Sequence, residues 1–253
     1  MPQCPNTPRA RVELLGVGFD NVGFDEVCQV ISSHVRTRVP GYMMSLNTDI
    51  LIRSDRDASF RSALMGADLV LMDSVPLIRI ARKKGIEVRE KLAGSDLMPM
   101  ICEFAAREGL SCYFLGGAEG VPERAAERLA AACPGLRVAG ALSPEYGFER
   151  DPAKVSEVVS RVSEARPDIL FVCLGEPKAS SFIVGNMAVM GTPFSLSVGA
   201  AVDFAAGSAR RAPTWMQRAG LEWLYRFFGE PRRLFRRYFI DSWHLLALLR
   251  KSR

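Results

Sequence analysis

Residues 112–135 read CYFLGGAEGVPERAAERLAAACPG, and they show the unit from which most of the chain is built. An apolar run, Cys112–Leu115, is followed by two glycines and then by a helical pattern at Val121–Ala132. Pro134-Gly135 marks the turn into the next apolar run. A strand that is apolar at nearly every position is typical of a sheet covered by helices on both faces.

The same alternation of strand and helix continues to residue 206. We expect strands at Val12–Val17, Tyr42–Leu46, Leu69–Met72, Cys112–Leu115, Leu136–Ala139, Ile169–Leu174 and Phe194–Ser197. We expect helices at Phe24–Thr37, Ala58–Met65, Ser95–Arg107, Val121–Ala132, Pro152–Ala165 and Lys178–Met190. Ser95, which follows Gly94, is the expected N-cap of its helix. Alternation of this kind predicts an α/β fold with a doubly wound, mostly parallel, Rossmann-like sheet.

The charge of the chain is concentrated at one end. The whole chain of 253 residues has a net charge of +5. Residues 207–253 contain eleven Lys and Arg against three Asp and Glu, a net charge of +8, so residues 1–206 sum to −3. From residue 207 the pattern is helical and rich in arginine and aromatic residues. We therefore divide the chain into an α/β core, 1–206, and a basic helical appendage, 207–253, suited to phosphates.

Cysteine usage and hydropathy indicate a cytosolic protein. None of the cysteines, at positions 4, 28, 102, 112, 133 and 173, forms a Cys-x-x-Cys pair, so we expect reduced core residues. The two histidines, His34 and His244, lie far apart, which argues against zinc. The N-terminus does not resemble a signal peptide. No segment reaches the run of about 18 apolar residues of a spanning helix, so at a membrane the chain would lie on the surface.

Small and polar residues follow the ends of the expected strands. They are Asn47, Asp73, Gly116-Gly117, Gly175 and Gly199. In an open parallel sheet, ligands bind beyond the carboxyl ends of the strands. These residues therefore predict a nucleotide site at one edge of the sheet.

Each local motif has a functional and a structural interpretation. Gly116-Gly117 is suited to hold a phosphate on exposed N–H groups, but a tight strand–helix turn is the more economical interpretation. Gly16-Val17-Gly18 lacks the third glycine of a dinucleotide fingerprint, because Asn21 stands at that position. Asp55-Arg56-Asp57 matches the Asp-x-Asp pattern of metal–diphosphate sites, although a solvated acidic helix start explains it better.

Asp73 is a carboxylate at the end of a buried strand. Such a group is costly unless it is solvated, paired or functional. A general base that takes a proton from an incoming hydroxyl is one functional use. Helix capping is the structural alternative, because Pro76 is suited to open a helix. These residues alone leave the two interpretations open.

The appendage carries the most specific sequence. Residues 199–238 read GAAVDFAAGSARRAPTWMQRAGLEWLYRFFGEPRRLFRRY. Arginines are interleaved there with tryptophan, tyrosine and phenylalanine. Arginine forks match phosphate oxygens, and the aromatic rings need burial in protein, in lipid or against bases. Phosphate and membrane binding therefore compete here with nucleic-acid binding.

This stretch resembles the WecG/TagA/CpsF family of bacterial glycosyltransferases, and the resemblance covers about Leu14 to Tyr238. The family's closing pattern is matched by Gly199, Asp203, Phe204, Gly207, Arg211-Ala212-Pro213, Leu221-Glu222-Trp223, Arg226, Glu230-Pro231 and Arg233. Upstream, its order is kept by Asn47, Asp73, Gly94-Ser95-Asp96-Leu97, Phe114-Leu115-Gly116-Gly117, Leu174-Gly175 and Pro177-Lys178.

The resemblance implies an inverting, metal-independent transferase. Such an enzyme moves N-acetylmannosamine or a related sugar from UDP to a polyprenyl-diphosphate-linked sugar in cell-surface polysaccharide synthesis. It implies Asp73 as catalytic base with Ser45 beside it. It implies a donor site made by Asn47, Lys91, Gly116, Gly117, Gly175, Gly199 and Asp203. Arg226, Arg233 and Arg236 of the appendage would close over the diphosphate and dock the chain on the inner face of the cell membrane.

The chain departs from the family pattern at three places. Ser74 follows Asp73 where the family has glycine, and Ala179-Ser180 replaces Gln-Glu after the Pro-Lys pair. Lys91 stands where arginine is common, which keeps the charge but loses the guanidinium fork. The same reaction with a different sugar is therefore one expectation, and an inactive or reassigned member is another.

Two other functions compete with the transferase. A nucleic-acid-binding protein would use the basic aromatic appendage, and salt-sensitive oligonucleotide binding would favour it. A nicotinamide-dependent oxidoreductase would need the missing third glycine. We expect a UDP-sugar, a lipid-linked acceptor and a membrane surface as partners, with no cofactor and no nucleic acid. An apolar appendage face is also compatible with a homo-oligomer.

Overall fold

The computed structural model describes residues 11–209 and, beyond them, residues 212, 213, 216, 224, 225, 243, 245 and 248–250. The strands are β1(Arg11–Leu14), β2(Val17–Asp20), β3(Gly41–Leu46), β4(Leu69–Met72), β5(Ser111–Gly116), β6(Arg137–Leu142), β7(Ile169–Cys173) and β8(Phe194–Ser197). The helices are α1(Phe24–Thr37), α2(Thr48–Arg56), α3(Ala58–Gly66), α4(Val75–Lys83), α5(Gly94–Glu108), α6(Val121–Ala132), η1(Phe148–Arg150), α7(Pro152–Ala165), α8(Lys178–Met190) and α9(Ala201–Ala205).

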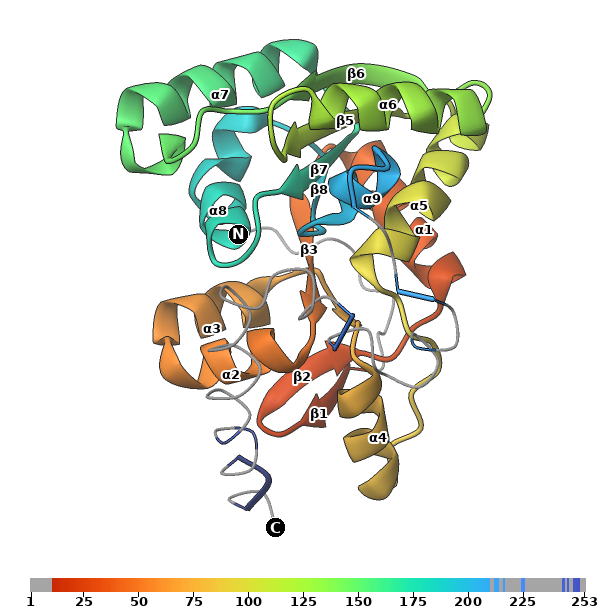
Figure 1. Ribbon diagram of the computed structural model, residues 1–253, viewed down its shortest axis with the longest axis vertical. Helices are drawn as coiled ribbons and strands as arrows, with labels where there is room; N and C mark the ends of the chain where they lie inside the picture. Colours follow the sequence, from red (N-terminus) through yellow and green to blue (C-terminus); the bar gives the residue numbers. More distant parts are fainter. Residues whose placement is uncertain are drawn as a thin grey trace.

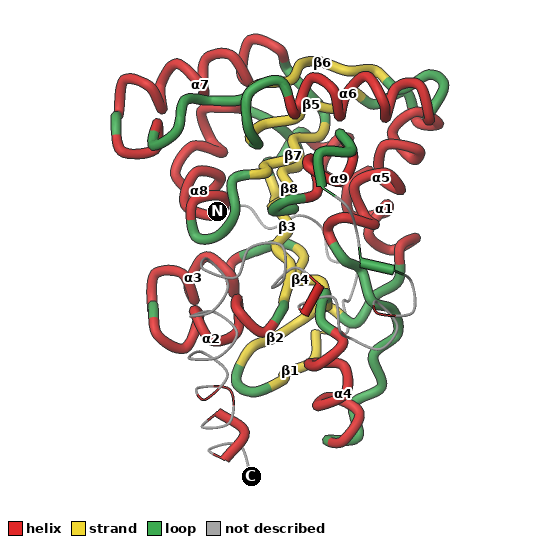
Figure 2. The backbone as a smooth tube through the Cα atoms, in the orientation of Figure 1, coloured by secondary structure: helices red, strands yellow, loops and turns green. Residues whose placement is uncertain are grey.

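The centre of the molecule is a parallel sheet with the strand order β4-β3-β8-β7-β5-β6. All five neighbouring pairs run parallel; Leu46 lies opposite Met72, for example, and Val172 opposite Ser197. Figure 2 shows this sheet as the middle layer between two layers of helices. The predicted α/β class and the parallel sheet are therefore confirmed.

The helices divide into two layers because side chains alternate along each strand. Met43 and Met44, which are neighbours in β3, belong to different core clusters. The cluster of Met44 contains buried side chains of α2, α3, α7 and α8. The cluster of Met43 contains side chains of α1, α5, α6 and α9. Figure 1 shows the two helical layers on opposite sides of the sheet.

Several helices begin where a polar side chain satisfies their first N–H groups. The Asn47 side chain accepts hydrogen bonds from Asp49 N and Ile50 N at the start of α2. The Asp57 side chain does the same for Ser59 N and Phe60 N at the start of α3. The helical interpretation of Asp55-Arg56-Asp57 is therefore confirmed for Asp57.

The expected strand Val12–Val17 is wrong. Leu15 and Gly16 both have positive φ, 53° and 78°, and they form the turn of a separate antiparallel hairpin, β1–β2. A two-residue turn with positive φ at both positions matches the twist of a hairpin. Gly16-Val17-Gly18 is therefore a hairpin turn and the start of β2, not a phosphate loop.

Three further expectations differ at helix starts. Ser95 is not an N-cap, because α5 already begins at Gly94 and its N-cap residue, Ala93, has no side-chain hydrogen bond to offer. Helices α2 and α9 were not expected, and for α4 only the opening at Pro76 was noted. These three helices are short: α2 and α4 have nine residues each and α9 has five. Each starts within four residues of the end of a strand, so in the sequence its apolar residues are hard to distinguish from those of the strand.

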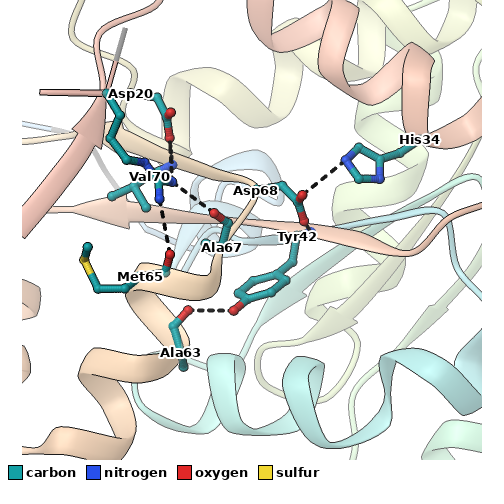
Figure 3. Close-up of polar contacts among 9 residues, drawn as sticks. Asp20, His34, Tyr42, Ala63, Met65, Ala67, Asp68 and Val70 are labelled. Atoms are coloured by element: carbon teal, nitrogen blue, oxygen red, sulfur yellow. Dashed lines mark hydrogen bonds and ion pairs between the residues drawn. The ribbon is translucent and has the colours of Figure 1, made fainter. Parts of the chain in front are cut away.

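The amino edge of the sheet is held by two similar aspartate networks. Asp68 N donates to Tyr42 O at 2.9 Å, and Tyr42 N donates back to Asp68 Oδ2 at 3.1 Å. Asp168 and Ser111 exchange the same two bonds, at 3.0 and 2.9 Å. The end of α1 contributes a basic side chain to each: His34 lies 3.6 Å from Asp68 Oδ1, and Arg38 lies 3.2 Å from Asp168 Oδ1. Figure 3 shows the first network.

The described cysteines are free thiols, and all of them except the half-buried Cys28 are buried, as expected. Beyond residue 209 the described residues are few. Leu245 and Leu248 pack against the core cluster on the α8 side, and Trp243 is exposed. The helices with described residues include none that is long and apolar enough to cross a bilayer. The boundary between a core and an appendage at residue 207 stays a prediction.

Candidate active site

The carboxyl ends of the six parallel strands meet at one edge of the sheet, where the predicted site residues also lie. Strand β8 continues into α9 on one face, whereas its neighbours β3 and β7 continue into α2 and α8 on the other. Connections that leave to opposite faces open a crevice between them, which is the usual ligand position in such sheets. From β4 to β5 the edge spans four strand spacings, about 19 Å. It is therefore suited to an elongated ligand.

One group of predicted residues lies at the ends of β3 and β4. Asp73 N donates to Leu46 O at 3.0 Å, which places Asp73 beside Asn47. Asp73 and Asn47 are both partly exposed. The Asn47 carbonyl oxygen is engaged in capping α2, so its amide NH₂ is the group that remains chemically suited to a ligand.

Ser45 lies in β3, opposite Leu71 of β4, on the face covered by α5. Its Oγ is buried and has no hydrogen-bond partner among the described residues. A buried hydroxyl without a partner is uncommon and points to strain, bound water or function. Ser45 is two residues before Asn47, in the register pair next but one to the position of Asn47 and Asp73.

Lys91 approaches the same position on a separate segment. Leu92 N donates to Met72 O at 2.9 Å, so the chain around Lys91 runs beside the end of β4. The segment is anchored to the loop before α1, because Asn21 bonds Glu87 O and Arg89 N, at 2.8 and 2.9 Å. Lys91 and Asp73 are therefore brought together although they are far apart in the chain.

Helix α5 begins against the end of β8. A Cβ atom on Gly94 would lie 3.1 Å from Val198 O and 3.2 Å from Val198 Cα, so only glycine lets the helix start so close to the strand. The amino end of this 15-residue helix therefore lies beside Gly199, with no side-chain cap from Ala93. Such an end carries the partial positive charge of the first-turn N–H groups.

A second group of predicted residues lies at the ends of β5 and β7. Gly116 has φ of 109°, and a Cβ atom there would meet Cys173 O at 2.7 Å. Gly117 has φ of 89°, and its Cβ atom would meet Val202 of α9 at 3.0 Å. The glycine pair is therefore a tight strand–helix turn, as its structural interpretation predicted. Such a turn is compatible with a phosphate site but does not demonstrate one.

Asp203 and Gly175 belong to this second group. Burial, with a smaller contribution from the Asp203 carboxylate, raises the pKa of the Cys173 thiol to about 12, which places Asp203 near the end of β7. Gly175 has φ of 70° and follows the same strand two residues later. The nucleotide residues predicted from the sequence thus lie at one edge in two groups, with Gly199 between them.

Ser74, a departure from the family pattern, has a structural role. Its side chain is the N-cap of α4 and accepts a hydrogen bond from Leu77 N at 3.4 Å. Its hydroxyl also lies 3.4 Å from Thr48 Oγ1. The capping role proposed as an alternative for Asp73 is therefore taken by the next residue.

Asp57 of the Asp-x-Asp pattern has a structural role at the start of α3. Hydrogen bonds from the Ser59 side chain and from the Phe60 N–H lower the pKa of the Asp57 carboxyl, which is occupied in capping α3. Within the described ranges, no three His, Cys, Asp or Glu side chains are grouped as metal ligands.

One residue of this edge was not predicted. Glu176 follows Gly175 and is partly exposed. Its Oε2 accepts hydrogen bonds from Ser180 Oγ at 2.6 Å and Ser180 N at 3.2 Å, and its Oε1 accepts one from Ser197 Oγ at 2.6 Å. The available signal was weaker than for Asp73: Asp73 directly follows β4, whereas Glu176 is the third residue after β7. The predicted Arg226, Arg233 and Arg236 lie outside the described residues.

Comparison with known proteins gives a consistent result. Residues 12–253 match the model of the glycosyl transferase WecG/TagA/CpsF family. A relative from Bacillus spizizenii strain W23 is 26% identical over 212 residues, which are 84% of this chain and 80% of the relative. A relative from Bacillus subtilis strain 168 is 24% identical over 215 residues, 85% of this chain and 82% of the relative. Both are named N-acetylglucosaminyldiphosphoundecaprenol N-acetyl-beta-D-mannosaminyltransferase.

The family match spans almost the whole chain, and the parallel α/β fold agrees with an enzyme that binds its ligand at the carboxyl edge of the sheet. The chain belongs to the WecG/TagA/CpsF family and is a glycosyltransferase.

Proposed function

We propose that the enzyme transfers N-acetylmannosamine or a related sugar from UDP to a sugar carried on a polyprenyl diphosphate, with inversion and without a metal ion. The names of the two Bacillus relatives support this donor sugar and this class of acceptor. The observation that carries the proposal is the meeting of Asp73, Asn47, Ser45 and Lys91 at the ends of β3 and β4, beside the start of α5.

Asp73 acts as the general base. It takes the proton of the acceptor hydroxyl while that oxygen attacks C1 of the donor sugar from the face opposite the leaving group. The bond between C1 and the β-phosphate oxygen breaks, and its electron pair leaves with UDP. One displacement of this kind inverts the configuration at C1. Ser45, buried directly beneath, is placed to hold the carboxylate or the reacting hydroxyl.

Positive charge meets the negative charge that develops on the diphosphate. The segment of Lys91 runs beside the end of β4, and α5 begins three residues later without a side-chain cap on its first N–H groups. Arg226, Arg233 and Arg236 of the appendage complete this charge in the proposal. Donors already in place when the charge forms are worth a few kcal/mol each in a closed site.

The nucleotide occupies the other half of the edge. Gly175 and Gly199 have no atom within 4 Å of where a Cβ would stand, so a ligand can approach the backbone there, beside the tight turn of Gly116 and Gly117. The Asp203 carboxylate is suited to accept hydrogen bonds from uridine. The basic appendage, residues 207–253, binds the anionic membrane on the cytoplasmic side, where the lipid-linked acceptor lies.

The test is UDP release from a panel of UDP-sugars, with and without a polyprenyl-diphosphate N-acetylglucosamine analogue, in the presence and absence of EDTA. We expect release that depends on the acceptor and persists in EDTA, and a product whose new bond has the opposite anomeric configuration by NMR. Release that EDTA abolishes contradicts metal independence, and the absence of UDP binding contradicts the proposal as a whole.

A further inference from the structure

We propose that Glu176 contacts a hexose in the active site and contributes to sugar specificity, by accepting a hydrogen bond from a ring hydroxyl or from the N–H of an acetamido group. This inference rests on the proposed function. It concerns the α8 side of the crevice, which none of the residues predicted from the sequence occupies except Gly175.

Two hydroxyl groups from different elements hold the Glu176 carboxylate in place. Ser197 Oγ, at the end of β8, donates to Oε1, and Ser180 Oγ, in the first turn of α8, donates to Oε2, both at 2.6 Å. Hydrogen bonds to an ionised oxygen are short and strong. The carboxylate is therefore fixed between the strand and the helix before any substrate arrives.

The carboxylate retains capacity for one more donor. An ionised carboxylate accepts about four hydrogen bonds. Oε2 receives two from Ser180, and Oε1 receives one from Ser197. Within residues 11–209 no basic side chain forms an ion pair with it; the nearby Lys178 pairs with Glu149 at 2.5 Å instead. A site on Oε1 is therefore left for a ligand.

The position of the carboxylate selects the part of the ligand that it meets. Side chains point alternately to the two faces of β8, and Phe194 and Leu196 point to the face covered by α5. Ser197, the partner of Glu176, therefore points to the other face, toward α8. The glycine pair and α9 lie on the opposite face. Counted along the sheet, β8 is two strand spacings, about 10 Å, from the strand that ends at Asp73.

Charge excludes the diphosphate as a partner. Two negative groups at short range repel one another, and a carboxylate offers no proton to donate. Hydroxyl and acetamido N–H groups of a hexose are the complementary donors. Both the donor sugar and the acceptor sugar carry them.

The departure at Ala179-Ser180 fits this assignment. The family commonly has Gln-Glu at these two positions, whereas here the carboxylate stands four residues earlier and Ser180 donates to it. Ala179 is completely buried and contacts the core. The polar side chains at the start of α8 are therefore organised around Glu176 in this chain.

Capping of α8 is the structural alternative, because Ser180 N donates to the same carboxylate. Glu176→Gln separates the two roles, since glutamine retains an oxygen for the cap but loses the charge. Glu164→Gln is the matched control, because Glu164 accepts a hydroxyl hydrogen bond from Ser160 at 2.7 Å on the exposed face of α7, also across four residues.

The experiment measures three constants for the full chain: KM for the UDP-sugar at saturating acceptor, KM for the acceptor analogue at saturating UDP-sugar, and Kd for UDP alone by calorimetry. In Glu176→Gln we expect one KM to rise about 10-fold or more, as for loss of a hydrogen bond to a charged group, with Kd for UDP within about twofold. A rise in the KM for the UDP-sugar identifies the donor sugar as the partner of Glu176, and a rise in the KM for the acceptor analogue identifies the acceptor sugar. Ser197→Ala, which loosens the carboxylate, should raise the same KM by a smaller factor.

Two results overturn the inference alone. The first is a native enzyme that turns over normally while Glu176→Gln changes neither KM by more than about twofold and lowers only Tm. The second is a Kd for UDP that rises as much as the KM, because the partner would then belong to the nucleotide. A native chain that transfers no sugar from any donor overturns the proposed function itself, and this inference with it.

Discussion

Strand β4 is flanked by an aspartate at each end, and the two have different surroundings. Asp68, at the amino end, is bound by Tyr42 N and approached by His34. Asp73, at the carboxyl end, lies where Asn47, Lys91 and the start of α5 come together. Four residues of buried strand separate them. The chemistry of a carboxylate is the same at both ends, so its surroundings decide whether it serves the fold or the reaction.

The amino edge repeats its arrangement and the carboxyl edge does not. Asp68 and Asp168 each precede a strand, donate a backbone bond to the neighbouring strand, accept one from its N–H on the carboxylate, and face a basic side chain from the end of α1. At the carboxyl edge, glycines, helix starts and a serine-held glutamate follow the strands instead. Repetition indicates a structural function, because any strand pair is aligned in the same way, whereas a ligand requires different groups at each position.

The largest effect is expected for Asp73→Asn. Loss of a general base lowers the rate by about 10²–10⁴-fold. Because the carboxylate is not part of the amino-edge networks, Tm should stay within a few degrees of the native value. The measurement is acceptor-dependent UDP release together with thermal unfolding. A variant with full activity would show that Asp73 is not the base, and one that unfolds would place it with the structural aspartates.

Asp168→Asn should show the opposite behaviour. The Asp168 carboxylate accepts hydrogen bonds from Ser111 N and Ser111 Oγ, at 2.9 and 2.8 Å, and pairs with Arg38. Asparagine keeps the shape but loses the charge, and we expect the free energy of unfolding to fall by about 2–3 kcal/mol. Urea unfolding measures this loss. The activity of the folded fraction should equal that of the native enzyme, and a fall in kcat would contradict the division between the two edges.

Gly116→Ala tests the carboxyl edge through its backbone. The new Cβ atom would collide with Cys173 O at a positive φ, so we expect a loss of about 2 kcal/mol in unfolding free energy and weaker UDP binding. Gly147→Ala is the control: its φ is 83°, but no atom lies within 4 Å of the new Cβ. It should lose about 1 kcal/mol and bind UDP normally. Equal UDP affinity in both variants would remove Gly116 from the nucleotide site.

The sequence was sufficient to predict most of the fold because strands and helices here differ clearly in period. Leu69–Met72 is apolar at every position, whereas Phe194–Ser197 alternates apolar residues with serine, and both are strands with the predicted ends. Val12–Val17 fitted the same pattern, but the chain turns at Leu15-Gly16. This turn requires a positive φ at Leu15, and a leucine gives no sign of that conformation in the sequence. Local apolarity therefore locates buried strands well and hairpin turns poorly.

The residues of the candidate site were predicted one by one from the sequence. Their proximity in space could not be predicted in the same way. The segment of Lys91 lies beside the end of β4 because Leu92 N bonds Met72 O, and α5 packs closely on the end of β8 because Gly94 has no Cβ. Glu176 was missed because it is the third residue after β7, whereas Asp73 directly follows β4. Its hydroxyl partners, Ser180 and Ser197, lie on two other elements, and a contact of this kind depends on the packing of α8 against β8.

The smallest effect concerns Tyr42, beside Asp68 at the amino edge. Burial, and then the Asp68 charge, raises the pKa of Tyr42 from 10.0 to about 12. The neutral phenol donates to Ala63 O at 2.6 Å, so Tyr42→Phe should cost about 1 kcal/mol at pH 8. The stabilisation that Tyr42 gives the native chain is fully present below pH 10 and is lost between about pH 10 and 12, because Tyr42 ionises at lower pH in the unfolded chain than in the folded one. At pH 11 this ionisation lowers the unfolding free energy of the native chain by about 1.4 kcal/mol. The phenylalanine variant has no phenol to ionise, so the difference in stability between the two chains should close. Urea midpoints of both chains at pH 8 and pH 11 measure it, and a difference that does not change with pH would show that the phenol at this edge is not held neutral by its surroundings.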